Sequence, residues 1–144
     1  MLKEYRFSEA RKEFTHLFDD VQNSVPSLIK ARKQSEQDGV FINKLILAEF
    51  LEHYKFHIEK FENEGTHSIW IKPIEEYAIG ETEEECKKEA AKAVQSFAED
   101  FINDPYMFKA KNMRPLIPYA SRILLCDDLD DIEQILFEEE YAEV

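Results

Sequence analysis

The feature that most constrains this 144-residue chain is the uneven distribution of its formal net charge of −13. Residues 1–65 hold ten basic and twelve acidic side chains, whereas residues 66–144 hold eight and nineteen. The first 33 residues are the one basic stretch, with seven basic side chains against five acidic ones. This division, with Gly65 at its centre, predicts a two-part chain with modules at residues 1–64 and 65–144.

The composition indicates a folded protein rather than a disordered acidic chain, because hydrophobic residues make up 44% and aromatic residues 12% of the sequence. No apolar run approaches the roughly 18 residues of a membrane span, and no apolar stretch follows the N-terminus. Cys86 and Cys126 stand far apart and match no metal or redox spacing. We therefore expect free thiols, a cytoplasmic location and no membrane contact.

In the N-terminal part, hydrophobic spacing predicts a helix, a hairpin and a second helix. Ser8 is placed to cap the first helix, whose apolar positions run to Val21. Residues 25–31 and 40–42 resemble two short strands joined by the polar loop 32–39. Asn43 can cap a longer helix with apolar positions that continue through Ile58 to Phe61.

The C-terminal part is expected to combine strands with helices, which makes the whole chain α+β. Residues 68–72 and 77–79 read as strands, and Thr82 and Glu85 form a T-x-x-E capping box for a helix that reaches Phe101. Two further helices are expected, over residues 118–125 and 129–138, with an Asp-Asp cap between them.

No motif in the sequence supports catalysis or a resident metal or cofactor. His53 and His57 have the four-residue spacing of zinc ligands on one helix, but no third ligand is evident, and a solvated helix explains them better. The acidic pairs lack the spacing and glycine of a calcium loop. Neither cysteine has a histidine close to it in sequence, so we expect a protein that is not an enzyme.

Two groups of residues could contact partners. The basic side chains Arg6, Arg11, Lys30, Arg32 and Lys33 could neutralise phosphates, especially if doubled on a dimer, although interleaved acids make a solvated face equally plausible. The segment 104–125 is rich in methionine and aromatic residues, which suits either a partner groove or a second core.

The sequence also resembles a known family. The run Tyr5–Phe14, with Ser8-Glu9-Ala10-Arg11 inside it, is similar to the start of Phd/YefM antitoxins from bacterial toxin–antitoxin pairs. Later segments resemble the toxin-binding region of RelE/RelB-type antitoxins, and together these segments cover most of the chain. They are residues 79–85, 97–101 and 112–119. The Gly80-x-Thr82-x-x-Glu85 piece also occurs in HicB-like antitoxins.

This resemblance implies an antitoxin whose N-terminal module forms a homodimer on operator DNA and whose C-terminal module blocks a cognate basic RNase toxin. The DNA contacts it implies are Arg6, Ser8, Arg11, Lys30, Arg32 and Lys33. Family members often carry a compact basic turn where this chain has the longer loop 32–39 with two acids. The toxin contacts expected from the aromatic segment and the resemblance are Tyr106, Met107, Phe108, Asn112, Met113, Leu116, Ile117 and Tyr119.

Two other functions fit the same sequence. An acidic DNA-binding regulator without a toxin would use the basic N-terminal stretch alone. An adaptor that mimics nucleic acid would use only the acidic C-terminal part. The negative charge after Gly65 favours the antitoxin, because an RNA-cleaving partner must attract phosphate and is expected to be basic.

Overall fold

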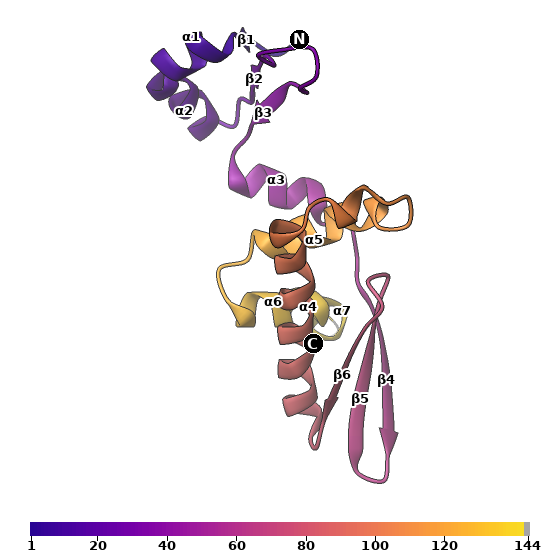
Figure 1. Ribbon diagram of the computed structural model, residues 1–144. Helices are drawn as coiled ribbons and strands as arrows, with labels where there is room; N and C mark the ends of the chain where they lie inside the picture. The colour runs from indigo at the N-terminus through magenta and orange to yellow at the C-terminus, as the bar shows by residue number, and fades with distance from the viewer. Residues whose placement is uncertain (143–144) are drawn as a thin grey trace. The chain divides into compact units, whose positions relative to one another are not determined.

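The computed structural model describes residues 1–142 and divides into two compact units, Met1–Phe50 and Leu51–Val144 (Figure 1). Both units combine helices with a three-stranded sheet, so the α+β class is confirmed. The division differs from the expected one between residues 64 and 65. That position falls in the turn between β4 (His57–Asn63) and β5 (Thr66–Lys72), and these strands pair from end to end.

In the N-terminal unit, the helices α1 and α2 pack against a small sheet with strand order β1-β2-β3. The strands β1 and β2 are parallel, and α1 and α2 form the crossover between them, whereas β2 and β3 form the expected hairpin. The elements are β1 (Glu4–Tyr5), α1 (Phe7–Lys12), α2 (Phe14–Gln22), β2 (Ser27–Ile29), β3 (Gly39–Phe41) and α3 (Lys44–Leu51).

The core of this unit is small, and much of its apolar surface stays exposed. Tyr5, Ala10 and Leu17 are buried together, with Ile29 and Phe41 partly buried against them. The rings of Phe14 and Phe18 lie 5.8 and 6.2 Å from the ring of Phe41, yet both phenylalanines are exposed. The apolar helix α3 contains no buried residue.

The predicted helix from Asn43 to Phe61 is wrong beyond Leu51. Asn43 does cap α3, since its Oδ1 accepts from the backbone N–H of Leu45 at 2.8 Å. After Leu51 the chain instead forms β4, which pairs with β5. The two strands are joined by a two-residue hairpin turn at Glu64 and Gly65, which both have positive φ, 53° and 82°. His57 consequently lies on a strand, and it does not share a helix with His53.

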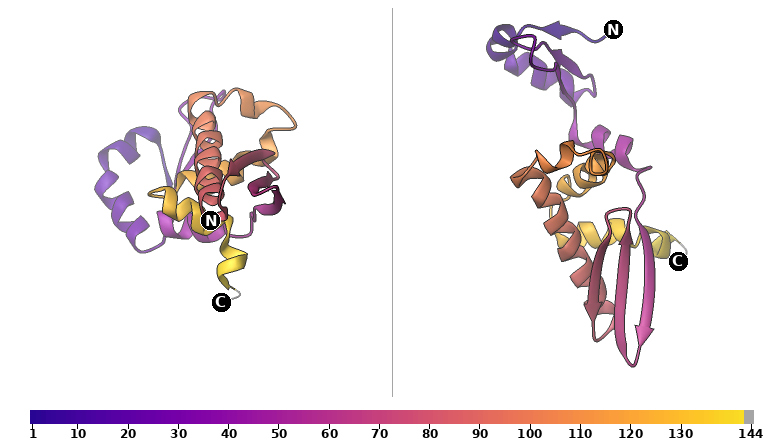
Figure 2. Two further views of the ribbon diagram at one scale, coloured as in Figure 1. Left: turned by 90° about the horizontal axis from the view of Figure 1, so that it is seen from below. Right: turned by 45° about the vertical axis from the view of Figure 1, so that its right-hand side comes forward.

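In the C-terminal unit, the meander β4-β5-β6 has one face covered by the long helix α4, as Figure 2 (right) shows. The helices α5 and α6 pack against α4. Thr82 caps α4 as predicted, because its Oγ1 accepts from the N–H of Glu85 at 3.0 Å. The remaining elements are β6 (Glu76–Gly80), α4 (Glu83–Asn103), the 3₁₀ turns η1 (Met107–Lys109) and η2 (Arg114–Leu116), α5 (Ile117–Leu124), α6 (Leu129–Leu136) and α7 (Glu138–Ala142).

Ion pairs hold the acidic helix α7 against the rest of this unit. Glu140 pairs with Lys60 and with Lys87, and the Lys87 Nζ also lies 4.8 Å from the centroid of the Phe137 ring. Glu138 pairs with Lys55 at 2.9 Å. Lys60 of β4 and Lys87 of α4 thus both pair with the acidic helix α7.

Candidate functional site

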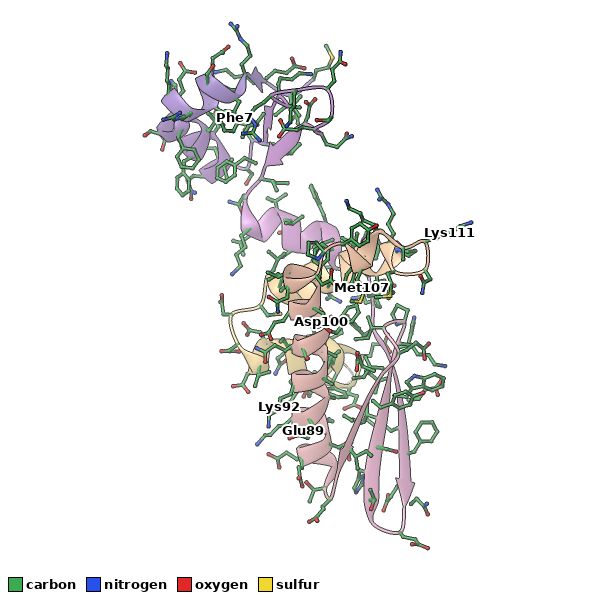
Figure 3. All side chains as sticks on the ribbon, in the orientation of Figure 1. Phe7, Glu89, Lys92, Asp100, Met107 and Lys111 are labelled. Atoms are coloured by element: carbon green, nitrogen blue, oxygen red, sulfur yellow. The ribbon has the colours of Figure 1, made fainter. Side chains whose placement is uncertain are left out.

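The structure brings three of the six expected DNA contacts to one edge of the N-terminal unit. The N–H of Lys30 donates to the carbonyl of Tyr5 at 2.9 Å, so the chain leaves β2 beside the start of α1. The guanidinium of Arg32 lies 5.1 Å from the centroid of the Phe7 ring, and Phe7 (labelled in Figure 3) directly follows Arg6. Arg6, Lys30 and Arg32 therefore border the N-terminal end of α1.

Each of these three cations is already paired with an acid. The Nε of Arg6 lies 2.5 Å from a Glu9 oxygen. In the loop between β2 and β3, Lys30 reaches Asp38 at 3.2 Å and Arg32 reaches Glu36 at 2.6 Å. Both acids of the longer loop 32–39 thus pair with Lys30 and Arg32, two of the basic side chains that the family resemblance assigns to DNA.

The pKa values at this loop move in the direction that these ion pairs require. Side-chain hydrogen bonding with Arg32 lowers the pKa of Glu36, and the same bond raises the pKa of Arg32. The pKa of Asp38 is lowered first by the backbone N–H of Ala31, which donates to it at 2.8 Å, and then by Lys30. Glu36 and Asp38 are therefore ionised at neutral pH and remain paired with Arg32 and Lys30.

The other three expected DNA contacts are exposed. Arg11 and Lys33 make no ion pair within residues 1–142. Ser8 is not the helix cap that the sequence suggested, because α1 begins at Phe7 and the N-cap position belongs to Arg6. As a result the Ser8 hydroxyl lies in the first turn of α1, on the same helix as Arg11 and three residues before it.

The expected toxin contacts separate into exposed and buried side chains. Tyr106 is 75% exposed and Met107 is 40% exposed, and Asn112 is also exposed. Met107 and Lys111 are labelled in Figure 3 on the segment that follows α4. These outward side chains remain available to a partner.

Phe108 is a core residue, which corrects its prediction as a partner anchor. It is 1% exposed, and its ring lies 4.9 Å from that of Phe101, edge to face. Four more of the expected contacts pack partly buried against the same core: Met113, Leu116, Ile117 and Tyr119. The sequence left a partner groove and a core as alternatives for this segment. These five residues belong to, or pack against, the core of the C-terminal unit.

A further surface, which the sequence analysis did not single out, lies on the sheet of the C-terminal unit. On the face opposite the buried Ile69, Ile71 and Ala78, four apolar side chains lie close together, and we call this set the outer sheet face. It comprises Phe61, Trp70, Tyr77 and Ile79. The sequence signal was the unbroken apolar run Ile69-Trp70-Ile71, where a half-exposed strand would carry a polar residue in the middle.

The two units of the structure differ more in net charge than the two halves expected from the sequence. The N-terminal unit, Met1–Phe50, has eight basic and eight acidic residues and is formally neutral. The C-terminal unit, Leu51–Val144, has ten basic and twenty-three acidic residues and carries the entire net charge of −13. Any electrostatic attraction to a basic partner therefore comes from the C-terminal unit.

The described residues 1–142 contain no cluster of metal ligands, and their buried cysteine has a thiol of low reactivity. Within them, no three His, Cys, Asp or Glu side chains are placed to hold a metal ion, and no helix is long and apolar enough to cross a membrane. Burial, followed by the charges of Glu83 and Glu85, raises the pKa of the Cys86 thiol. Cys86 is therefore a poor nucleophile at neutral pH.

A family model, PHD_like, described as antitoxin of toxin–antitoxin RelE/RelB systems, matches residues 1–138. The chain belongs to this family, and it is an antitoxin of a toxin–antitoxin system.

One solved structure has the same fold. It is the crystal structure of an antitoxin part of a proposed toxin/antitoxin system from Syntrophomonas wolfei subsp. wolfei, with a TM-score of 0.80 and 23% sequence identity. The similarity covers 93% of this chain and 96% of that chain. No curated protein matches the sequence.

Proposed function

We propose that the C-terminal unit binds and neutralises a cognate basic RNase toxin of the RelE kind in the cytoplasm, and that the N-terminal unit dimerises and represses the antitoxin's own operon. The observation that carries the proposal is the location of the full charge of −13 in residues 51–144. An RNase must attract phosphate, so we expect it to present a basic surface, which the acidic unit would complement with faster association.

Co-expression tests the toxin half of this proposal. The antitoxin is expressed with the small basic protein encoded beside it, and growth, RNA integrity and complex formation are measured. Rescue of growth together with a stable complex supports the proposal. Continued RNA cleavage with no complex contradicts it.

Dimerisation by the N-terminal unit is supported by the apolar surface that this unit leaves exposed. Leu45 on α3 is 72% exposed and Phe50 is 59% exposed. An isolated helix as short as α3 is unstable in water and needs an apolar surface to pack against. Sedimentation of the full chain should give a dimer, and Leu45→Glu should shift it to monomer.

Operator binding depends on releasing the paired cations. In the double variant Glu36→Gln/Asp38→Asn, Lys30 and Arg32 lose their acidic partners. If these cations contact DNA, the variant binds operator DNA more tightly and with a steeper salt dependence. Alanine at Arg11, which is exposed and has no acidic partner within residues 1–142, should weaken binding, and unchanged binding in both variants would show that DNA does not contact this surface.

One alternative is favoured by the same ion pairs. An acidic adaptor that binds no nucleic acid would have its N-terminal cations neutralised, as Arg6, Lys30 and Arg32 are here. Gel-shift experiments at low salt distinguish the two functions. Absence of both a DNA complex and a toxin complex would favour the adaptor, whereas absence of a DNA complex with retained toxin binding would leave toxin neutralisation as the sole role.

A further inference from the structure

The outer sheet face presents an organised apolar surface. Trp70 and Tyr77 are directly paired across β5 and β6, and their rings stack with centroids 5.5 Å apart and planes 8° from parallel. Phe61 on β4 and Ile79 on β6 both pair with Ser68, and they flank it on the same face. Phe61 is 53%, Tyr77 61% and Ile79 66% exposed, so the surface can receive a partner.

Trp70 is held in a fixed orientation before any partner arrives. Its Nε1 donates to Glu75 at 2.9 Å. The Nζ of Lys72 lies 3.7 Å from the centroid of the Trp70 ring, and the same amine pairs with Glu59 at 3.0 Å. Aromatic side chains that are already ordered lose less conformational entropy on binding, which makes them effective anchors.

The strands and turns that carry this apolar surface belong to an acidic part of the chain. Residues 57–85, which contain the sheet and the start of α4, hold nine acidic and two basic residues, a net charge of −7. Both basic residues are occupied, Lys72 by Glu59 and Lys60 by Glu83 and Glu140. Three exposed acids stand in the turns at the ends of the strands and form what we call the acidic rim: Glu64, Glu75 and Glu81.

The negative charge of residues 57–85 favours some binding partners of the outer sheet face over others. A stacked Trp–Tyr pair on an open sheet could hold nucleic-acid bases, but phosphates would approach a region with a net charge of −7. A second copy of the chain would bring the same negative charge against itself. A basic protein gains both apolar burial and charge complementarity.

We propose that the outer sheet face is the docking site of a basic protein, which, on the function proposed above, is the RNase toxin. An apolar or aromatic side chain of the toxin packs against Trp70 and Tyr77, while its Lys and Arg side chains meet the acidic rim. The toxin contact surface thereby extends beyond Tyr106 and Met107 to a second face of the same unit.

Threonine variants test the site, because threonine retains strand propensity and removes the large apolar groups. In the full chain, Phe61→Thr/Tyr77→Thr/Ile79→Thr should raise the dissociation constant for the basic protein encoded beside the antitoxin at least tenfold. The matched control Val40→Thr changes an exposed strand residue of the N-terminal unit, 52% exposed, and should leave the constant unchanged. Loss of binding in Tyr106→Thr alone, with the triple variant unaffected, overturns the proposal.

A measurement on the unmutated chain keeps the test independent of variant folding. Trp70 is the sole tryptophan, so labelling the antitoxin with 5-fluorotryptophan gives one ¹⁹F resonance that reports on this surface. The proposal requires this resonance to shift when the unlabelled basic protein is added. A complex seen by sedimentation without a shift overturns the docking site and leaves the proposed function standing, whereas no complex at all defeats the proposed function itself.

Two control titrations address the other occupants. A resonance that shifts with oligouridine in place of the protein identifies RNA as the occupant, and one that shifts with antitoxin concentration alone identifies a second copy. Either result overturns the proposal. An unchanged resonance in both, together with a shift on addition of the basic protein, supports it.

Discussion

The guanidinium of Arg122 on α5 lies 3.0 Å from the carboxylate of Glu138 at the start of α7. The same side chain donates from Nη1 to the carbonyl of Tyr54 at 3.1 Å, and it is only 7% exposed. One buried arginine therefore joins the segment before the sheet, α5 and the acidic C-terminal helix.

Replacing Arg122 with alanine should lower the free energy of unfolding of the C-terminal unit by about 2–3 kcal/mol. The loss leaves the Tyr54 carbonyl and the Glu138 carboxylate without their buried donor, and the part-exposed position of Glu138 reduces the full penalty of a broken buried pair. Urea unfolding followed by circular dichroism measures the change. Lys55→Ala, which removes a more exposed partner of Glu138, should cost less than about 1 kcal/mol, and equal losses would contradict the assigned role of Arg122.

Acid should weaken the attachment of α7. Burial alone would raise the pKa values of Glu138 and Glu140, but hydrogen bonds from Lys55 and Arg122, and from Lys60 and Lys87, outweigh it and lower both pKa values below 4.5. The stability that these carboxylates contribute is therefore present above pH 4.5 and is lost as the pH falls through their lowered pKa values. The unfolding midpoints of the wild type and of Glu138→Gln/Glu140→Gln should differ at pH 7 and converge as the pH falls below the lowered pKa values, and a constant difference throughout would count against the ion pairs.

Glu76 has the opposite pH dependence. Burial, and then the charge of Asp100, raises the pKa of this carboxyl above 4.5, so its ionised form opposes folding at neutral pH. Glu76→Gln should therefore increase the thermal unfolding midpoint at pH 7. The gain should shrink as the pH falls through the raised pKa and vanish well below pH 4.5, where the carboxyl is protonated in both states, and a gain that persists there would contradict the electrostatic cause.

Gly80 should not tolerate a side chain. A Cβ at this position would lie 2.6 Å from the backbone nitrogen of Cys86 and 2.9 Å from its Cα, so β6 and the first turn of α4 would have to move apart. We expect Gly80→Ala to cost about 1–3 kcal/mol in urea unfolding. Gly39→Ala meets no atom within 4 Å and should leave stability nearly unchanged, and a similar loss in both variants would refute the steric explanation.

The sequence predicted the elements whose signals are local. The Thr82 cap and the following helix depend on hydrogen bonds between residues three or four apart, and the structure shows the Glu85 side chain accepting from the N–H of Glu81 at 3.3 Å as well. The β2–β3 hairpin likewise follows from short strands and a polar loop. These elements need no knowledge of distant contacts.

The failures came from tertiary contacts. Ile58 and Phe61 continued a helical spacing, but Ile58 faces the core and Phe61 the outer sheet face, so the alternation that marks a strand was concealed by an exposed aromatic residue. The Glu64-Gly65 turn was the local signal that could have corrected this. The burial of Phe108 depends on Phe97 and Phe101, and its sequence neighbours do not reveal it.

The acids of the loop between β2 and β3 act as tethered competitors for any phosphate backbone. Asp38 and Glu36 are attached to the same loop as Lys30 and Arg32, so their local concentration near those cations is far above that of a dissolved ligand. A nucleic acid must displace them, and each exchange replaces one carboxylate by one phosphate without changing the charge held by the cation. Affinity at this edge should consequently depend less on salt than the number of basic side chains implies.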